Sequence, residues 1–183
     1  MERAAGLFAE RGIAATSVDE VLEAAGAGKG QFYHYFRGRD ELAAAAVGYR
    51  CGQVLTGLTQ ALGGVSSLAG LEQALAGFVA GFEQAGMPGC PIGTLATEVA
   101  GRNEGARLQA AAGFDAWERL LADALGRMRQ RGELRADAQP GVLATGLLAS
   151  IEGGMVLSQA RKDMASLRIA VDAGLAQVRA YLN

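Results

Sequence analysis

The sequence predicts an all-α protein in which a compact three-helix start precedes a larger helical body. Strand signals are nearly absent, because β-branched and aromatic residues are sparse and no segment alternates convincingly with period two. Apolar residues recur instead at three- and four-residue spacing between glycine and proline breaks. Half of the 183 residues are hydrophobic, so the chain can bury a sizeable core and is not a disordered tail.

Helical segments follow one another along the whole chain. We expect helices over residues 2–11, 17–25, 29–36, 39–62 and 66–84, an element that opens at 90–91, and helices over 103–131, 140–160 and from 166 onward. Gly12 ends the first helix, and Ser17 with Glu20 forms a capping box that opens the second. Residues 26–28 interrupt the chain before the third helix, which is rich in aromatic side chains.

The later helices have equally clear limits. Gly63 and Gly64 end the fourth helix, and Pro91 suits the first position of the element it opens. Gly132 ends the long amphipathic helix expected over residues 103–131. We expect Ser166 to cap the last helix, whose apolar residues form a stripe at helical spacing.

Composition excludes several classes of protein. No apolar stretch approaches the ~20 residues of a membrane span, and no signal peptide opens the chain, so we expect a cytoplasmic protein without a membrane partner. Cys51 and Cys90 are too few for a disulfide framework, and with a single histidine they argue against a metal site or cofactor. The formal net charge of −2 means that any basic surface must be local.

The segment from Gly26 to Gly30 resembles a phosphate-binding loop. A Walker A loop needs a glycine five residues before its Gly-Lys pair, a Ser or Thr after the lysine, and a preceding strand. Here Glu23 occupies the first glycine position, Gly30 follows Lys29, and a helix precedes the loop. A nucleotide-binding enzyme is therefore the least favoured alternative.

Two short helices joined by a glycine turn, over residues 17–36, are typical of a helix-turn-helix motif. Phe32 and Phe36 lie four residues apart and can anchor the second helix on the first two, while its polar residues point outward. The only charges between residues 24 and 39 are basic, which suits a DNA backbone.

Residues 7–42, LFAERGIAATSVDEVLEAAGAGKGQFYHYFRGRDEL, resemble the DNA-binding domain of TetR/AcrR-type transcriptional regulators. The shared pattern is Leu-Phe, Gly, Thr-Ser, an apolar helix ending in Ala-Gly, an aromatic helix, and a basic residue before Glu-Leu. The resemblance implies a DNA-binding domain at 1–45 and a helical effector-binding and dimerisation domain at 46–183. It also implies a homodimeric regulator, commonly a repressor, that binds a double-stranded operator and a small apolar or aromatic inducer and is not an enzyme.

Position by position, the resemblance implies a set of DNA contacts. These are Ser17, Lys29, Gly30, Gln31, Tyr33, His34, Tyr35 and Arg39. Gln31 can pair with an adenine edge, whereas Tyr33 and Arg39 would contact phosphates. Family members usually carry more residues before Leu7 than this chain does, so a helical interaction protein with impaired DNA binding stays an alternative.

The body holds candidate effector contacts, for which ordinary core packing is the alternative. They are Phe78, Phe82, Cys90, Trp117 and Met155. Cys90 precedes Pro91 at a helix start, where the helix dipole favours the thiolate. The thiol could therefore sense electrophiles or oxidants in place of a reversible ligand, or simply fill a turn.

The last two helices hold candidate dimer contacts. Small residues of the first helix and the stripe of the second suggest half of a four-helix interface, with tight packing inside one subunit as the alternative. The residues are Gly146, Ser150, Gly153, Leu167, Val171, Leu175 and Val178.

Overall fold

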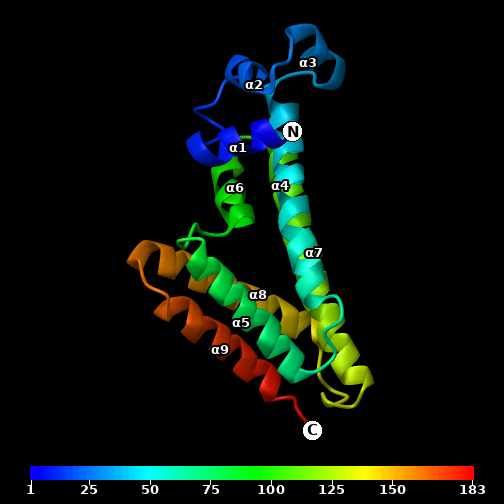
Figure 1. The fold of residues 1–183 in the computed structure, drawn as a ribbon. Helices are drawn as coiled ribbons and strands as arrows, with labels where there is room; N and C mark the ends of the chain where they lie inside the picture. Colours follow the sequence, from blue (N-terminus) through cyan, green and yellow to red (C-terminus); the bar gives the residue numbers. More distant parts are fainter. The chain divides into compact units, whose positions relative to one another are not determined.

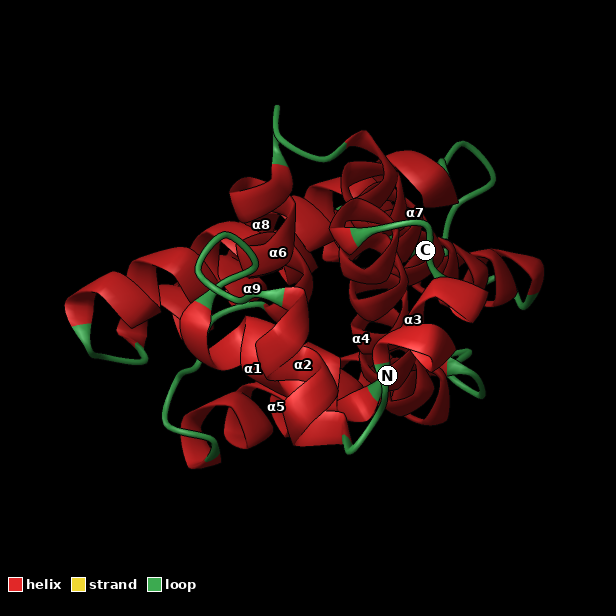
Figure 2. Ribbon diagram, turned by 90° about the horizontal axis from the view of Figure 1, so that it is seen from above, coloured by secondary structure: helices red, strands yellow, loops and turns green.

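The computed structural model describes all 183 residues and contains helices joined by loops, which confirms the predicted all-α class (Figure 1, Figure 2). The helices are α1 (Glu2–Arg11), α2 (Val18–Ala25), α3 (Lys29–Tyr35), α4 (Arg39–Leu62), α5 (Leu68–Gln84), α6 (Pro91–Val99), α7 (Glu104–Gln130), α8 (Pro140–Arg161) and α9 (Ala165–Arg179). Most limits agree closely with the expected ones, because the caps and breaks that set them are local in sequence.

The chain divides into two compact units. The first unit combines residues 1–54 with residues 91–114, and the second combines residues 55–90 with residues 115–183. Helix α6 therefore belongs to the same unit as the three N-terminal helices, although it lies far from them in sequence. Helices α4 and α7 contribute residues to both units. The boundary after residue 45 stays a prediction, since these units follow packing rather than chain order.

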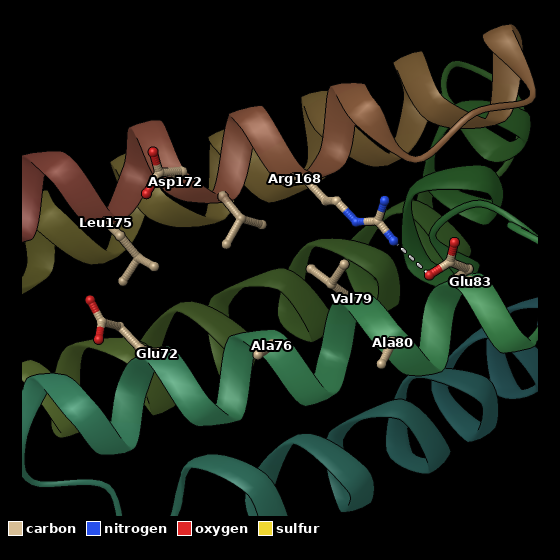
Figure 3. Close-up of a pocket in the computed structure, with 9 residues that line it drawn as sticks. Glu72, Ala76, Val79, Ala80, Glu83, Arg168, Asp172 and Leu175 are labelled. Carbon is tan, nitrogen blue, oxygen red and sulfur yellow. Dashed lines mark hydrogen bonds and ion pairs between the residues drawn. The ribbon is translucent and has the colours of Figure 1, made fainter.

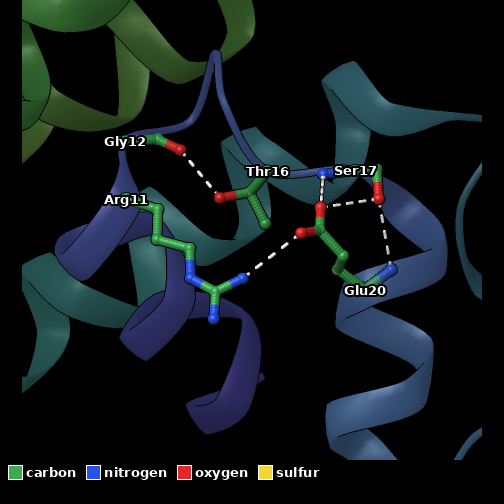
Figure 4. A network of polar contacts seen from close by, with 5 residues as sticks. All are labelled: Arg11, Gly12, Thr16, Ser17 and Glu20. Carbon is green, nitrogen blue, oxygen red and sulfur yellow. Dashed lines mark hydrogen bonds and ion pairs between the residues drawn. The ribbon is translucent and has the colours of Figure 1, made fainter.

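The capping box at the start of α2 forms as expected (Figure 4). The Ser17 hydroxyl accepts a hydrogen bond from the Glu20 amide at 3.2 Å, and the Glu20 carboxylate accepts one from the Ser17 amide at 2.7 Å. These bonds satisfy amide groups that a helix start otherwise leaves unpaired. At the other end of α2, Gly26 adopts a left-handed conformation with φ of 63°, which favours glycine.

A small apolar core holds the first unit together. Phe8 of α1, Leu22 of α2, Phe32 of α3 and Leu42 of α4 are all buried. The Phe32 and Phe36 rings lie 5.5 Å apart, so the expected aromatic anchor of α3 is present, although Phe36 is only half-buried. One buried ring is enough to fix a seven-residue helix while leaving its other side chains in solvent.

The core of the second unit is built from α5, the last part of α7, α8 and α9. Its fully buried side chains include Trp117, Leu121, Leu147 and Leu167. Helices α8 and α9 pack closely at Gly154. A Cβ atom at that position would lie 2.9 Å from the Leu167 Cα atom. Glycine is therefore required at this crossing by close approach of the two backbones.

Ser166 does not cap the last helix. Helix α9 begins at Ala165, and Ser166 is buried, with its hydroxyl accepting a hydrogen bond from Arg161 at 2.9 Å. Ser158 of α8 instead accepts a hydrogen bond from the Leu167 amide at 2.9 Å. The expected cap was wrong because Ser158, a residue of the neighbouring helix, supplies the acceptor. The sequence around Ser166 does not indicate that partner.

Helix α8 is long and apolar enough, by length and composition, to cross a membrane. The expectation that no segment approaches a membrane span is therefore corrected for this helix. Of the most apolar 18-residue stretch of α8, 44% is buried inside the structure. The core helix of a globular protein can be equally long and apolar. Helix α8 packs against α9 as such a core helix does.

Candidate nucleic-acid interface

Helix α3 presents a continuous set of polar and aromatic side chains to solvent. Six expected DNA contacts on this helix are exposed: Lys29, Gly30, Gln31, Tyr33, His34 and Tyr35. Tyr33 and Tyr35 are 66% and 65% exposed, values that are unusual for side chains of this size. An isolated exposed aromatic residue needs no explanation, but two on one seven-residue helix indicate a surface that meets a partner.

A depression of about 240 Å³ lies between α2 and α3. Ser17, Lys29 and Tyr33 line it together, so the structure brings three expected contacts to one place. The start of α2 also opens there, and its amide groups favour an anion. The depression therefore has the donors and the positive charge that a DNA phosphate needs.

Asp19 also lines this depression and was not anticipated as part of the site. Its carboxylate lies 3.0 Å from the Lys29 ammonium group, and both side chains are 70% exposed. An ion pair this exposed contributes little to stability. A phosphate at Lys29 would have to compete with Asp19 for the ammonium group.

The Ser17 hydroxyl is already engaged in the absence of DNA. Besides accepting from the Glu20 amide, it donates to the Glu20 carboxylate at 2.7 Å (Figure 4). The Ser17 amide and hydroxyl hold the pKa of Glu20 below its usual value, with a smaller contribution from Arg11. Because the hydroxyl has one proton to donate, a phosphate contact requires it to turn away from Glu20.

Arg39 has a structural task that the sequence did not indicate. Its guanidinium group donates to the backbone carbonyl groups of Ile13, Ala14 and Thr16 in the loop between α1 and α2. Three of its five N–H donors are used in this way. The phosphate contact of Arg39 stays a prediction. In the protein without DNA, Arg39 holds the loop between α1 and α2.

The expected effector contacts are largely buried in the second unit. Phe82, Cys90, Trp117 and Met155 are each at most 6% exposed, while Phe78 is half-buried. The structure brings two of them together, since the Phe78 and Trp117 rings lie 5.7 Å apart. Burial alone does not distinguish an effector contact from a core residue, so these residues stay predictions.

Glu152 is a polar residue of the second unit that the sequence analysis missed. It is the only acidic residue of α8, and its carboxyl group is hydrogen-bonded to the Cys90 side chain. Burial raises the pKa of Glu152. Its buried Oε1 atom has no hydrogen-bond partner. A lone carboxylate in an apolar helix was the available signal, and it was overlooked among the neighbouring glycines.

A groove of about 370 Å³ runs between α5 and α9 (Figure 3). Its apolar lining includes Ala76, Val79 and Leu175, and ion pairs lie along it. Arg168 pairs with Glu83 at 2.8 Å, and Arg179 pairs with Glu72 at 2.7 Å. None of the expected effector contacts lines this groove.

The expected dimer contacts of α9 lie inside the second unit. Leu167, Val171, Leu175 and Val178 are at most 6% exposed within one subunit, although Val171 and Leu175 also line the groove between α5 and α9, so their contact with a second subunit stays a prediction. A helical stripe has the same spacing in a core and in an interface, which is why the pattern was ambiguous. On α8, Gly153 is exposed, whereas Gly146 and Ser150 are half-exposed.

Fold and interface together define a helix-turn-helix DNA-binding protein with a helical C-terminal part. Residues 1–46 match the family described as bacterial regulatory proteins, tetR family. Residues 67–173 match the C-terminal domain of LmrA/YxaF-like transcriptional regulators. The chain belongs to the TetR family of transcriptional regulators, which confirms the resemblance seen in residues 7–42.

Known proteins similar to this chain share most of its length. Rv0196 of Mycobacterium tuberculosis, an HTH-type transcriptional regulator, is 33% identical over 181 residues, covering 90% of this chain and 84% of the relative. The regulatory protein TetR from Rhodobacter sphaeroides has a TM-score of 0.77 at 26% identity, covering 96% of this chain and 94% of that chain. A SmeT–triclosan complex has a TM-score of 0.70 at 22% identity, covering 100% and 89%, and this likeness concerns the fold alone.

Proposed function

We propose that this DNA-binding transcriptional regulator is a homodimeric repressor that a small apolar or aromatic molecule releases from its operator. The observation that carries the proposal is the solvent-facing set of polar and aromatic side chains on α3, fixed from behind by Phe32. A helix of this kind fits the major groove, where Gln31 can read an adenine edge. Lys29, Tyr33 and the start of α2 then hold the backbone phosphates.

Effector binding is assigned to the second unit. The neighbouring Phe78 and Trp117 rings supply apolar surface there, and the unpaired Glu152 oxygen can accept a hydrogen bond from a ligand. SmeT, a repressor of the same fold, has been solved with triclosan. A ligand that favours the conformation without DNA by about 1–3 kcal/mol would give ordinary coupling, carried by α4 and α7 because each has residues in both units.

The dimer surface is assigned to the exposed face of α8 together with α9. Val142, Val156 and Leu157 of α8 and Ile169 of α9 are between 45% and 70% exposed. Such apolar side chains on two adjacent helices favour association. Two operator half-sites require a two-fold protein, and the proposed place of action is the cytoplasm, where the DNA lies.

A direct test is binding to the intergenic DNA beside the protein's own gene, titrated with salt and compared with a scrambled duplex. We expect sequence preference, and we expect Gln31→Ala to lower it by about 1–3 kcal/mol for the preferred duplex. Lys29→Ala should weaken binding to both duplexes and reduce the salt slope by about one. Equal binding to every duplex tried, including those selected from a random pool, would favour the interaction-protein alternative.

A further inference from the structure

The loop between α1 and α2, residues 12–17, positions the start of the DNA-contacting helices. It begins at Gly12, whose φ of 83° favours glycine, and it ends at Ser17, the cap of α2. Inside the loop, the buried Thr16 side chain donates to the Gly12 carbonyl at 2.8 Å (Figure 4). Any movement of this loop therefore moves the helix start that lines the depression between α2 and α3.

Two side chains from distant parts of the chain hold this loop. Arg39, at the start of α4, donates to carbonyl groups of the loop, including that of Ala14 at 2.8 Å. Glu98 of α6 accepts a hydrogen bond from the Ala14 amide at 3.0 Å. Ala14 is thus bound through its carbonyl group by a cation and through its amide by an anion, two interactions stronger than neutral hydrogen bonds.

Glu98 approaches the loop close to Gly12, where the absence of a Cβ atom leaves room for its carboxylate. A Cβ atom at that position would lie 3.0 Å from the Glu98 Oε1 atom. Gly12 therefore serves both the positive φ and the close approach of the carboxylate. Close by, the side-chain amide of Asn103 donates to the Asp40 backbone carbonyl at 3.0 Å, so the segment after α6 is also tied to the start of α4.

We propose that Glu98 is a positioning residue for DNA binding. By accepting from the Ala14 amide, its carboxylate holds the α1–α2 loop in the conformation that aims Ser17, α2 and α3 at DNA. A loop held in advance loses less conformational entropy when DNA binds, so the contact raises affinity without touching DNA. Glu98 lies outside residues 1–46, which match the family's DNA-binding domain.

The sign of the effect separates positioning from simple electrostatics. Glu98 is negative, so removing its charge should leave DNA affinity unchanged or raise it slightly if charge is all that matters. Glu98→Asp keeps the charge but shortens the side chain by about 1.5 Å, one carbon–carbon bond, and so loses the hydrogen bond. Glu98→Gln removes the charge but keeps an oxygen that can accept from Ala14.

The experiment measures binding of the full-length protein to the duplex that the wild-type protein selects from a random pool. We expect Glu98→Asp to weaken binding about three- to tenfold, as the loss of one hydrogen bond predicts. Glu98→Gln should bind at least as tightly as wild type. Hydrogen exchange of the Ala14 amide should be faster in Glu98→Asp and close to wild type in Glu98→Gln.

The matched controls are Glu104→Asp and Glu104→Gln, since Glu104 pairs with Arg107 on the same unit and makes no hydrogen bond to the loop. Thermal unfolding of each variant shows that binding is compared between folded proteins. Wild-type affinity in Glu98→Asp despite faster Ala14 exchange overturns the proposal. Equal weakening in Glu98→Asp and Glu98→Gln also overturns it, because the retained acceptor would then have no effect.

Discussion

Helices α3 and α9 each carried a set of expected contact residues, and the structure places the two sets in opposite environments. The α3 residues point into solvent around one buried phenylalanine, whereas the α9 stripe from Leu167 to Val178 lies in the core. A seven-residue helix with a single buried side chain covers little surface, so its polar residues remain in solvent. A fifteen-residue amphipathic helix has one apolar face, and only its neighbours decide what covers that face.

The largest expected effect is on stability and concerns the buried apolar stripe of α9. Leu167→Ala removes a side chain that is fully buried, so we expect a loss of about 2–5 kcal/mol in the free energy of unfolding. Chemical denaturation at several protein concentrations would measure it. Ile169→Ala, on the same helix but 70% exposed, is the matched control, with an effect on subunit stability within about 0.5 kcal/mol.

The same pair of positions also tests where the dimer surface lies. We expect Ile169→Lys to weaken dimerisation, measured by light scattering over a concentration series, while Leu167→Ala leaves the dissociation constant of folded protein unchanged. If the Leu167 variant dissociates and the Ile169 variant does not, the exposed face of α8 and α9 is the wrong surface.

A second comparison sets Glu152, whose Oε1 atom is buried, against Glu20, whose side chain is 42% exposed. Burial raises the pKa of Glu152, so its ionisation costs stability as the pH rises through its folded pKa, and the group is most favourable below its unfolded pKa. Glu152→Gln should therefore stabilise the protein near pH 8 and change little near pH 4, as measured by thermal unfolding. Hydrogen bonds from Ser17 lower the pKa of Glu20, so its contribution has the opposite sign and is lost as the pH falls.

The smallest expected effect concerns the DNA-binding surface. Asp19→Asn removes the partner of Lys29 and one negative charge beside the phosphate depression. We expect roughly two- to fivefold tighter binding to both a preferred and a scrambled duplex, the range for an exposed ion pair. Glu23→Gln, an exposed change of the same charge on the same helix, is the control. An equal gain in that control would show that Asp19 acts only through net charge.

The two regions differ in how far sequence reasoning could reach. The capping box at Ser17, the glycine turn after α2 and the outward face of α3 depend on residues within about one helical turn of each other, and they were predicted correctly. The tasks of Arg39 and the presence of Glu152 beside Cys90 depend on partners that are distant in the chain. The cap expected from Ser166 was wrong for the same reason, since Ser158 supplies the acceptor.

The helical class, nearly all helix limits, the family and the polar face of α3 were predictable from the order of the amino acids alone. These follow from spacing, caps and glycine breaks, which act between near neighbours in the chain. Three features became visible only in the folded chain: α6 belongs to the same unit as the N-terminal helices, Glu98 binds the Ala14 amide 84 positions away, and the α9 stripe is buried within one subunit. A hydrogen-bonding group or an apolar helix face can pair with many different partners, and the packing of the whole chain determines which partner it contacts.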